Sequence, residues 1–190
     1  MASVFTHPVP ALALAVALGS RVIPPRLALV AFICAVLPDL DVLGFKFGVR
    51  YAEALGHRGL SHSLVLALGV GLLGALVAPW LKSKRTTAFL VLCAAVLSHI
   101  LLDAMTTGGL GVAFFWPFDE ARYFLPWRPI EVSPFSPRAF FSERGVTVIR
   151  SELLWVWLPC GLAALVGVVM RCKHAKFNDP VAVPKAMDSR

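Results

Sequence analysis

The chain has 190 residues, of which 58% are hydrophobic and only 15% are charged, and its mean hydropathy is +0.76. Soluble globular domains are about 45–50% apolar and about 25% charged, so the composition excludes an ordinary cytosolic enzyme, a disordered protein and a disulfide-rich secreted module. An integral membrane protein of one domain remains. The net charge of +7 does not indicate a nucleic-acid partner, because the basic residues form no stripe with aromatic residues.

The first two apolar runs, residues 8–20 and 27–38, are shorter than the roughly 20 residues that a membrane span needs. At 1.5 Å per residue each run covers about 18–20 Å, and we expect a helical hairpin that turns at residues 21–26. The pattern leaves a second possibility open, in which the first run begins nearer Met1 and the second continues to Phe47, so that both span the bilayer. No basic region precedes the first run, so a cleaved signal peptide is not expected.

Three later runs are long enough to span the bilayer as helices, at residues 63–81, 86–105 and 153–170. The sequence therefore predicts an all-α integral membrane protein, a helical bundle of three long transmembrane helices and an N-terminal pair of shorter helices. Residues 1–172 are expected to form its single domain. The tail, 173–190, is basic and polar, and we expect it to be disordered.

The Lys and Arg residues predict the direction of the five segments. Alternation along the chain places the turn at 21–26, the loop at 82–85 and the tail on one side, which carries ten Lys/Arg and two Asp/Glu, against eight and nine on the other. Loops rich in Lys and Arg stay in the cytoplasm, which predicts a cytoplasmic tail. The aromatic and proline-rich loop at 106–152 then lies outside, as an interfacial belt or as an entrance for an amphiphilic substrate.

Ionisable side chains near the apolar runs indicate function, because such groups are costly at membrane depth. His99 and Asp103 are four residues apart, which places them one turn apart on one face of a helix. An imidazole nitrogen and a carboxylate oxygen so placed can bind one divalent ion. The same spacing also fits a buried hydrogen-bonded pair that fixes helix packing.

Two further clusters lie at segment ends. His57 and His62 flank Arg58 between glycines that permit a tight turn, so both imidazoles can converge on a metal. Asp39 and Asp41 directly follow an apolar run, where the negative end of a helix dipole would favour a nearby cation. Asp39 is the preferred ligand, and Asp41 either binds metal or orients a ligand histidine.

Glu152 directly precedes the last apolar run, which fits an ordinary helix start, a metal ligand or a general base. The alternation of segments brings the following residues to one face of the membrane: His7, Asp39, Asp41, His57, His62, Asp103 and Glu152, with His99 one turn deeper. Nitrogen and oxygen donors without thiolate favour zinc, with manganese or iron as alternatives, and their number suits one to three ions. The four cysteines are expected to be buried hydrophobes, and His174 in the tail is expected to be solvated.

The order of these motifs resembles the YdjM-like family of bacterial and archaeal membrane-bound predicted metal-dependent hydrolases, which includes a LexA-regulated inner-membrane protein. The resemblance covers roughly residues 6–160 and rests on TH at 6–7, LPDLD at 37–41, GHRGLSHSL at 56–64, LSHILLD at 97–103 and WP at 116–117. The family is itself similar, at a distance, to zinc phospholipase C and P1-type nucleases. The resemblance implies a multi-pass protein of the cytoplasmic (inner) membrane with these metal ligands: His7, Asp39, His57, His62, His99 and Asp103, with Glu152 less securely. The direction of the segments predicts that the site lies near the outer face.

We therefore expect hydrolysis of a phosphoester, in a phospholipid or lipid-linked substrate, by a water that a divalent metal activates. Glu152 or Asp41 would accept the proton of this water, and Arg58 would clamp phosphate oxygens or neutralise the leaving group. Two alternatives use the same residues. One is a divalent-cation transporter, and the other is a non-catalytic protein whose helices are stapled by a metal with every position filled by protein. The sequence does not predict the oligomeric state.

Overall fold

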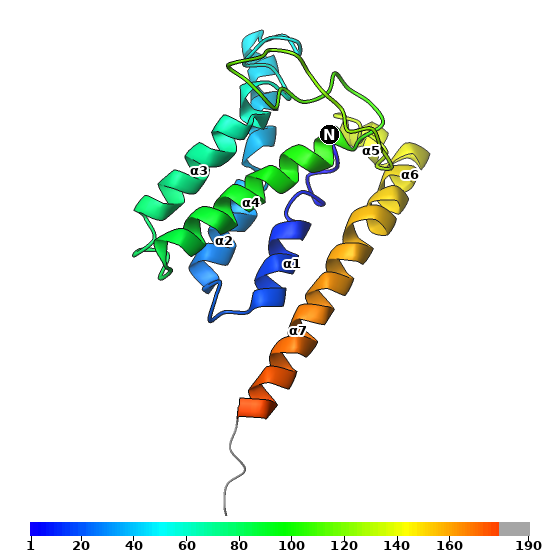
Figure 1. The fold of residues 1–190 in the computed structure, drawn as a ribbon. Coiled ribbons are helices and arrows are strands. Elements are labelled where there is room, and N and C mark those ends of the chain that lie inside the picture. Colours follow the sequence, from blue (N-terminus) through cyan, green and yellow to red (C-terminus); the bar gives the residue numbers. More distant parts are fainter. Residues whose placement is uncertain (179–190) are drawn as a thin grey trace, which may run out of the picture.

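The structure is a computed structural model, and it describes residues 1–178 as a bundle of helices (Figure 1). In chain order the elements are α1 (Val9–Leu18), α2 (Pro25–Cys34), the 3-10 helix η1 (Leu37–Phe47), the short 3-10 helix η2 (Leu60–His62), α3 (Leu64–Leu76), α4 (Arg85–Ala104), α5 (Pro137–Phe140), α6 (Glu143–Glu152), the π-helical turn η3 (Leu153–Trp157) and α7 (Leu158–Asn178). These described residues contain no β-strand, so the predicted all-α fold is confirmed.

Three helical stretches are long and apolar enough to cross a membrane: Pro25–Phe47, Arg85–Ala104 and Glu143–His174. The predicted number of long helices is therefore confirmed, but one of them is a different segment. The second apolar run continues through η1 to Phe47, which is the longer of its two alternatives. The first run stays short, since α1 has 10 residues and covers about 15 Å.

The predicted long helix at residues 63–81 is wrong, because α3 has 13 residues and ends at Leu76. Pro79 explains the early end, since its ring disfavours a helical conformation at the preceding residue and it has no backbone N–H to donate. At its other end α3 begins after Ser63, whose Oγ accepts a hydrogen bond from the backbone N–H of Leu66 at 3.1 Å.

Helix α4 lies at the centre of the bundle, in contact with α1, α2 and α3, and most of its residues are buried. Two glycines bring α3 close to it: a β-carbon on Gly74 would lie 2.6 Å from Leu92 Cδ1, and one on Gly71 would lie 3.0 Å from the Phe89 ring. In contrast, α7 packs mainly against the short helix α1 and leaves many large apolar side chains exposed. A bilayer around the bundle would cover them.

The last helix begins ten residues before its predicted start. α6, η3 and α7 form one continuous helical stretch from Glu143, so Glu152 lies inside a helix and does not precede one. The polar residues of α6 concealed this, because they occupy one face of an amphipathic helix that Ser142 caps. α7 continues to Asn178, beyond the predicted domain boundary at 172, and residues 179–190 of the predicted disordered tail lie outside the described residues.

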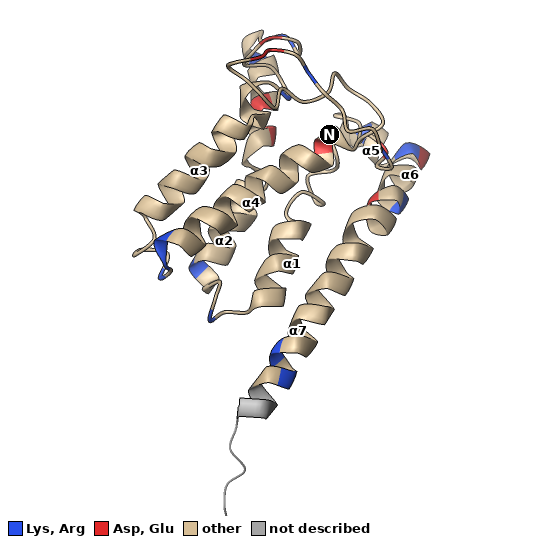
Figure 2. Ribbon diagram, in the orientation of Figure 1, with Lys and Arg blue, Asp and Glu red and all other residues tan. Residues whose placement is uncertain are grey.

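The two ends of the bundle differ in charge (Figure 2). The end formed by the α1–α2 turn, the α3–α4 turn and the end of α7 carries the basic residues Arg21, Arg26, Lys82, Lys84, Arg85 and Arg171. The acidic residues of the described chain lie toward the opposite end. This arrangement matches the alternation of segments, whereas the assignment of the basic end to the cytoplasm stays a prediction.

Candidate metal centre

Ionisable side chains from four parts of the chain meet at the end of the bundle opposite the basic turns. They form two groups whose nitrogen and carboxylate oxygen atoms lie within 4.8 Å of one another. The first group comprises His7, Asp39, His99 and Asp103, and the second comprises Asp39, His57 and His62. All six predicted ligands are therefore brought together, and Asp39 belongs to both groups. None of the four cysteines belongs to either.

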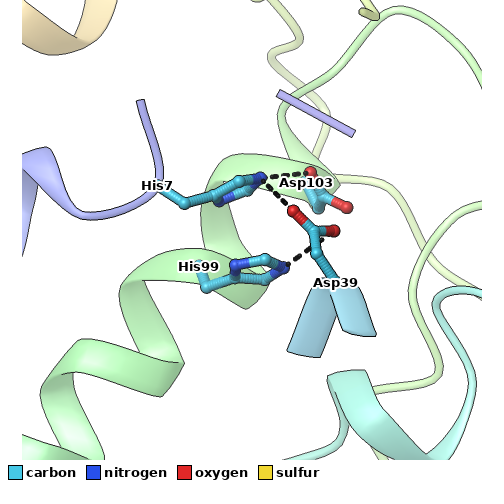
Figure 3. A group of neighbouring side chains, drawn as sticks. All are labelled: His7, Asp39, His99 and Asp103. Carbon is cyan, nitrogen blue, oxygen red and sulfur yellow. Dashed lines mark ion pairs between the residues drawn. The ribbon is translucent and has the colours of Figure 1, made fainter. Parts of the chain in front are cut away.

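The first group joins three elements (Figure 3). Helix α4 presents His99 and Asp103 on one face, one turn apart, and η1 presents Asp39. His7 reaches them from the segment before α1, with its Nε2 3.5 Å from Asp39 Oδ2 and 3.5 Å from Asp103 Oδ1. The imidazoles of His7 and His99 are stacked, with ring centroids 3.6 Å apart. His99 Nε2 lies 3.6 Å from Asp39 Oδ1, so one nitrogen of each ring faces the carboxylate of Asp39.

The second group lies directly beside the first. His62 Nε2 is 3.0 Å from His99 Nε2 and 3.4 Å from Asp103 Oδ2. The rings of His57 and His62 are perpendicular, with centroids 5.4 Å apart. Because Asp39 lies between the two groups, its two oxygens can serve two neighbouring ions.

Five buried atoms of these groups have no hydrogen-bond partner: both ring nitrogens of His7, both carboxylate oxygens of Asp39, and Nε2 of His57. The histidines of both groups are completely buried, and Asp39 is 6% exposed. An unsatisfied buried polar atom costs about 1–3 kcal/mol, and such atoms are rare in folded proteins. A cation held among them would satisfy all three side chains, so the residues fit a metal site.

Two of the histidine rings are held through their Nδ1 atoms, one by a carboxylate and the other by a backbone carbonyl. His57 Nδ1 is 2.6 Å from Asp41 Oδ1, and His99 Nδ1 is 2.8 Å from the carbonyl oxygen of Ala35. A proton on each Nδ1 leaves the Nε2 lone pair directed at the group, which is the usual arrangement of metal-bound histidine. The other oxygen of Asp41 accepts from Ser61 Oγ at 2.5 Å and from the Arg58 backbone N–H at 3.1 Å.

Both Asp41 oxygens are thus engaged within the protein. Of its predicted roles, the geometry favours orienting a ligand histidine over binding metal or accepting a proton. The carboxylate would be a positioning group for His57.

The protonation of two histidines suits metal binding. Burial lowers the pKa of His7 to about 4 and also lowers the pKa of His57. Both are therefore neutral at pH 7 and offer a lone pair. Burial acts in the same direction on His62, but its hydrogen bonds and charge interactions with Asp103 and Asp41 outweigh it and raise the pKa of this imidazole.

Arg58 is completely buried, and each of its three guanidinium nitrogens donates a hydrogen bond. Its Nε donates to Asp103 Oδ2 at 2.9 Å, its Nη1 to the carbonyl of Gly108 at 3.0 Å, and its Nη2 to Thr106 Oγ1 at 2.9 Å. Each of the three guanidinium nitrogens thus already donates within the protein, so the geometry favours a role in holding Asp103 over the predicted phosphate clamp. Gly109 makes room for it, because a β-carbon there would lie 2.8 Å from Nη1.

Glu152 lies outside both groups and binds the N-terminal segment. Its Oε2 accepts from Ser3 Oγ at 2.6 Å and from Thr6 Oγ1 at 2.8 Å, and Trp157 Nε1 donates to Thr6 Oγ1 at 2.9 Å. This geometry favours fixing the segment that carries His7 over the predicted ligand or base role. Sequence reasoning missed Ser3 and Trp157, although hydroxyl side chains directly before a histidine in an apolar segment are a usable signal.

Replacing Asp41 with asparagine is expected to weaken metal binding about 10- to 100-fold, the usual effect of losing the partner of a ligand histidine. All six candidate ligands remain in Asp41→Asn, so the stoichiometry at saturation should not change. Competition with a chelator of known affinity measures the shift. Asp119→Asn, at a carboxylate outside both groups that accepts from Tyr123 Oη and the Ala121 N–H, is the matched control, and equal affinities in the two variants would contradict the orienting role.

Two comparisons describe what the chain is similar to. Residues 1–176 match the family described as YdjM inner membrane protein. The chain is 48% identical over 160 residues to Inner membrane protein YbcI of Escherichia coli (strain K12), an alignment that covers 84% of this chain and 92% of that protein. No solved structure matches the chain. The predicted distant similarity to zinc phospholipase C and P1-type nucleases is not shown by these matches and stays a prediction.

Proposed function

The chain belongs to the YdjM family of inner membrane proteins, and from that premise we propose that it is a membrane-bound metal-dependent hydrolase. Its substrate would be a phosphoester in a phospholipid or a lipid-linked molecule. The observation that carries the proposal is the set of buried ligand atoms in His7, Asp39 and His57 that have no hydrogen-bond partner within the protein. A protein that used these residues only for packing would pair them.

Two adjacent ions are the occupancy that the two groups favour, with Asp39 as the shared ligand. Nitrogen and oxygen donors without sulfur suit zinc first, and manganese or iron next. Activation of water and polarisation of a phosphoryl oxygen are the chemistry that divalent ions supply in such sites. The chain itself would hold the ligands in place: Asp41 and the Ala35 carbonyl orient two imidazoles, and Arg58 holds Asp103.

The loop after α4 closes over the site and would exclude bulk water. Arg122 Nη1 donates to the backbone carbonyl of His57 at 2.7 Å, and the Ala113 N–H donates to the carbonyl of Arg58 at 3.0 Å. These contacts place part of the aromatic loop directly on the segment that carries the second group. They support the interpretation of this loop as a cover for the site, in addition to any interfacial role.

The transporter alternative is disfavoured by the distribution of charge. A cation path would have to continue to the basic end of the bundle, where the α1–α2 and α3–α4 turns carry Lys and Arg and no Asp or Glu. The stapling alternative requires that protein atoms fill every position around each ion, whereas a hydrolytic site keeps one position open.

Metal removal tests the proposal. Protein purified in detergent and loaded with Zn²⁺ is expected to hydrolyse bis-(p-nitrophenyl) phosphate or phosphatidic acid, to lose this activity on chelation, and to regain it with Zn²⁺ or Mn²⁺. In liposomes it should not carry Zn²⁺ across the bilayer. Zinc flux without hydrolysis would favour the transporter, and bound metal with neither activity would favour the structural staple.

A further inference from the structure

The two groups of candidate metal ligands are buried, so a substrate needs a path by which to reach them. Beside them lies an apolar chamber of about 360 Å³ with four phenylalanines among its lining residues: Phe5, Phe135, Phe140 and Phe141. The chamber adjoins the site, because the ring of Phe135 lies 5.3 Å from that of His57. Among its lining side chains, only those of Ser3 and Ser133 are polar. A strongly hydrated substrate gains little in such surroundings.

A second, larger hollow continues from this chamber down the side of the bundle. It is a groove of about 620 Å³ between α1 and α7, and we call it the α1–α7 groove. Its lining is apolar and includes Leu12, Ala13 and Gly161. Val4 and Phe5 line both the groove and the chamber, so the two hollows meet at these residues.

The groove has a closed end. α1 and α7 touch near their basic ends, where a β-carbon on Gly167 would lie 2.6 Å from that of Ala17, and Arg171 donates to the Val16 carbonyl at 2.7 Å. The two helices diverge from there toward the site (Figure 1). The length of α1 along the groove, from Val9 to Val16, is about 10 Å. The groove is thus a slot that is closed near the basic end and leads to the chamber at the other.

We propose that the α1–α7 groove binds the hydrocarbon chain of the substrate, which enters sideways from the bilayer. The chain would lie between α1 and α7 and pass through the phenylalanine chamber, and the phosphoester would lie at the end of the chamber against His57. The substrate class is then a phosphoester that carries a long hydrocarbon chain. The chemical identity of the head group rests on the proposed function, but the binding of a chain does not.

The continuity of the groove with the chamber argues for this occupant. The groove lies along two apolar helices of a protein that resides in a membrane, so a hydrocarbon chain is the solute at hand. The hollow along α3, which Gly69 and Leu72 line, reaches Leu60 and Ser63 beside His62 but shares no lining residue with the chamber.

Two glycines provide a matched pair of variants. A β-carbon on Gly161 would meet no atom within 4 Å, and the same is true of Gly69 on α3. A phenylalanine at Gly161 would therefore fill the α1–α7 groove without a clash at its β-carbon, whereas one at Gly69 would project into the separate hollow. Both changes add the same side chain to a helix that faces lipid.

Photolabelling tests the groove without any need for turnover. The protein would be placed in vesicles of phosphatidylethanolamine and phosphatidylglycerol that contain phosphatidic acid with a diazirine on its acyl chain. We expect the label to concentrate on α1 and α7 peptides around Leu12 and Ala164. Gly161→Phe should reduce this labelling about fivefold or more, because the new ring excludes the chain, and Gly69→Phe should not.

Thermal unfolding and metal content would verify that both variants are folded, and Ala164→Leu is a milder replacement in the same groove if Gly161→Phe unfolds. Label spread evenly over all lipid-facing helices, or undiminished in the folded groove variants, would overturn the proposal. Groove labelling in a protein that hydrolyses no phosphoester would support the groove and contradict only the hydrolase. Hydrolysis with evenly spread label would overturn the groove and leave the hydrolase.

Discussion

Replacing Asp39 with alanine is expected to weaken metal binding at both groups and to abolish hydrolysis. Asp39 is the one residue that the two groups share, and both of its oxygens lack a hydrogen-bond partner in the protein. Loss of a residue that only orients a ligand weakens binding about 10- to 100-fold, so loss of a shared ligand should exceed the upper end of that range. Asp39→Ala should therefore retain no stoichiometric metal after gel filtration.

Single-group variants sharpen this prediction. His7→Ala removes a residue of the first group only, and His57→Ala one of the second only. Each is expected to lose part of the bound metal, whereas Asp39→Ala loses all of it. Metal content and hydrolysis would be measured on the same samples, with Asp119→Ala as the control. Equal metal content in Asp39→Ala and the wild type would refute the shared-ligand arrangement.

Replacing Arg58 with methionine is expected to lower the free energy of unfolding by about 3–5 kcal/mol, the usual cost of removing one partner of a buried ion pair. Asp103 would lose its 2.9 Å partner in a fully buried position, and the Gly108 and Thr106 oxygens would lose theirs. Methionine keeps a β-carbon, so the positive φ of 66° at this residue is equally unfavourable before and after the change.

Denaturant titration in mixed micelles measures the difference. Arg144→Met is the matched control, because its ion pair with Glu131 is partly exposed and such pairs contribute only about 0–1 kcal/mol. Similar losses of unfolding free energy in the two variants would show that the buried Arg58–Asp103 pair stabilises the fold no more than the partly exposed Arg144–Glu131 pair. A stable Arg58→Met that binds metal but hydrolyses nothing would instead restore the phosphate-clamp hypothesis.

The composition of the candidate site could be predicted because membrane-embedded charge is costly. Histidines and aspartates at the ends of apolar runs are therefore identified as functional candidates, and the alternation of segments predicts that they lie at one end of the bundle. The i, i+4 spacing of His99 and Asp103 fixes their common face. These arguments need only one-dimensional spacing and direction.

The roles of the individual residues within the site could not be predicted from spacing and direction. Whether a buried carboxylate or guanidinium faces a ligand or another side chain depends on contacts between residues far apart in the sequence. Arg58 meets Asp103 from 45 residues away, and Glu152 meets Ser3 from 149 residues away. No local pattern carries this information.

Helix boundaries differed where local chemistry opposed hydropathy. Pro79 ends the helical path of an apolar run that is long enough to span. In the opposite direction, polar residues after Ser142 form the first turns of the last helix because they share its face with apolar side chains. Average hydropathy detects neither a helix that ends before a proline nor a helix that begins with an amphipathic segment.

The most direct test of a metal centre is elemental analysis of detergent-purified protein, the wild type beside the His57→Ala/His99→Ala double variant. His174→Ala, an exposed histidine on α7, is the control. We expect one to two equivalents of zinc or manganese in the wild type and the control, and loss of the metal in the double variant. No stoichiometric metal in any of the three, even after reconstitution with divalent ions, would contradict it.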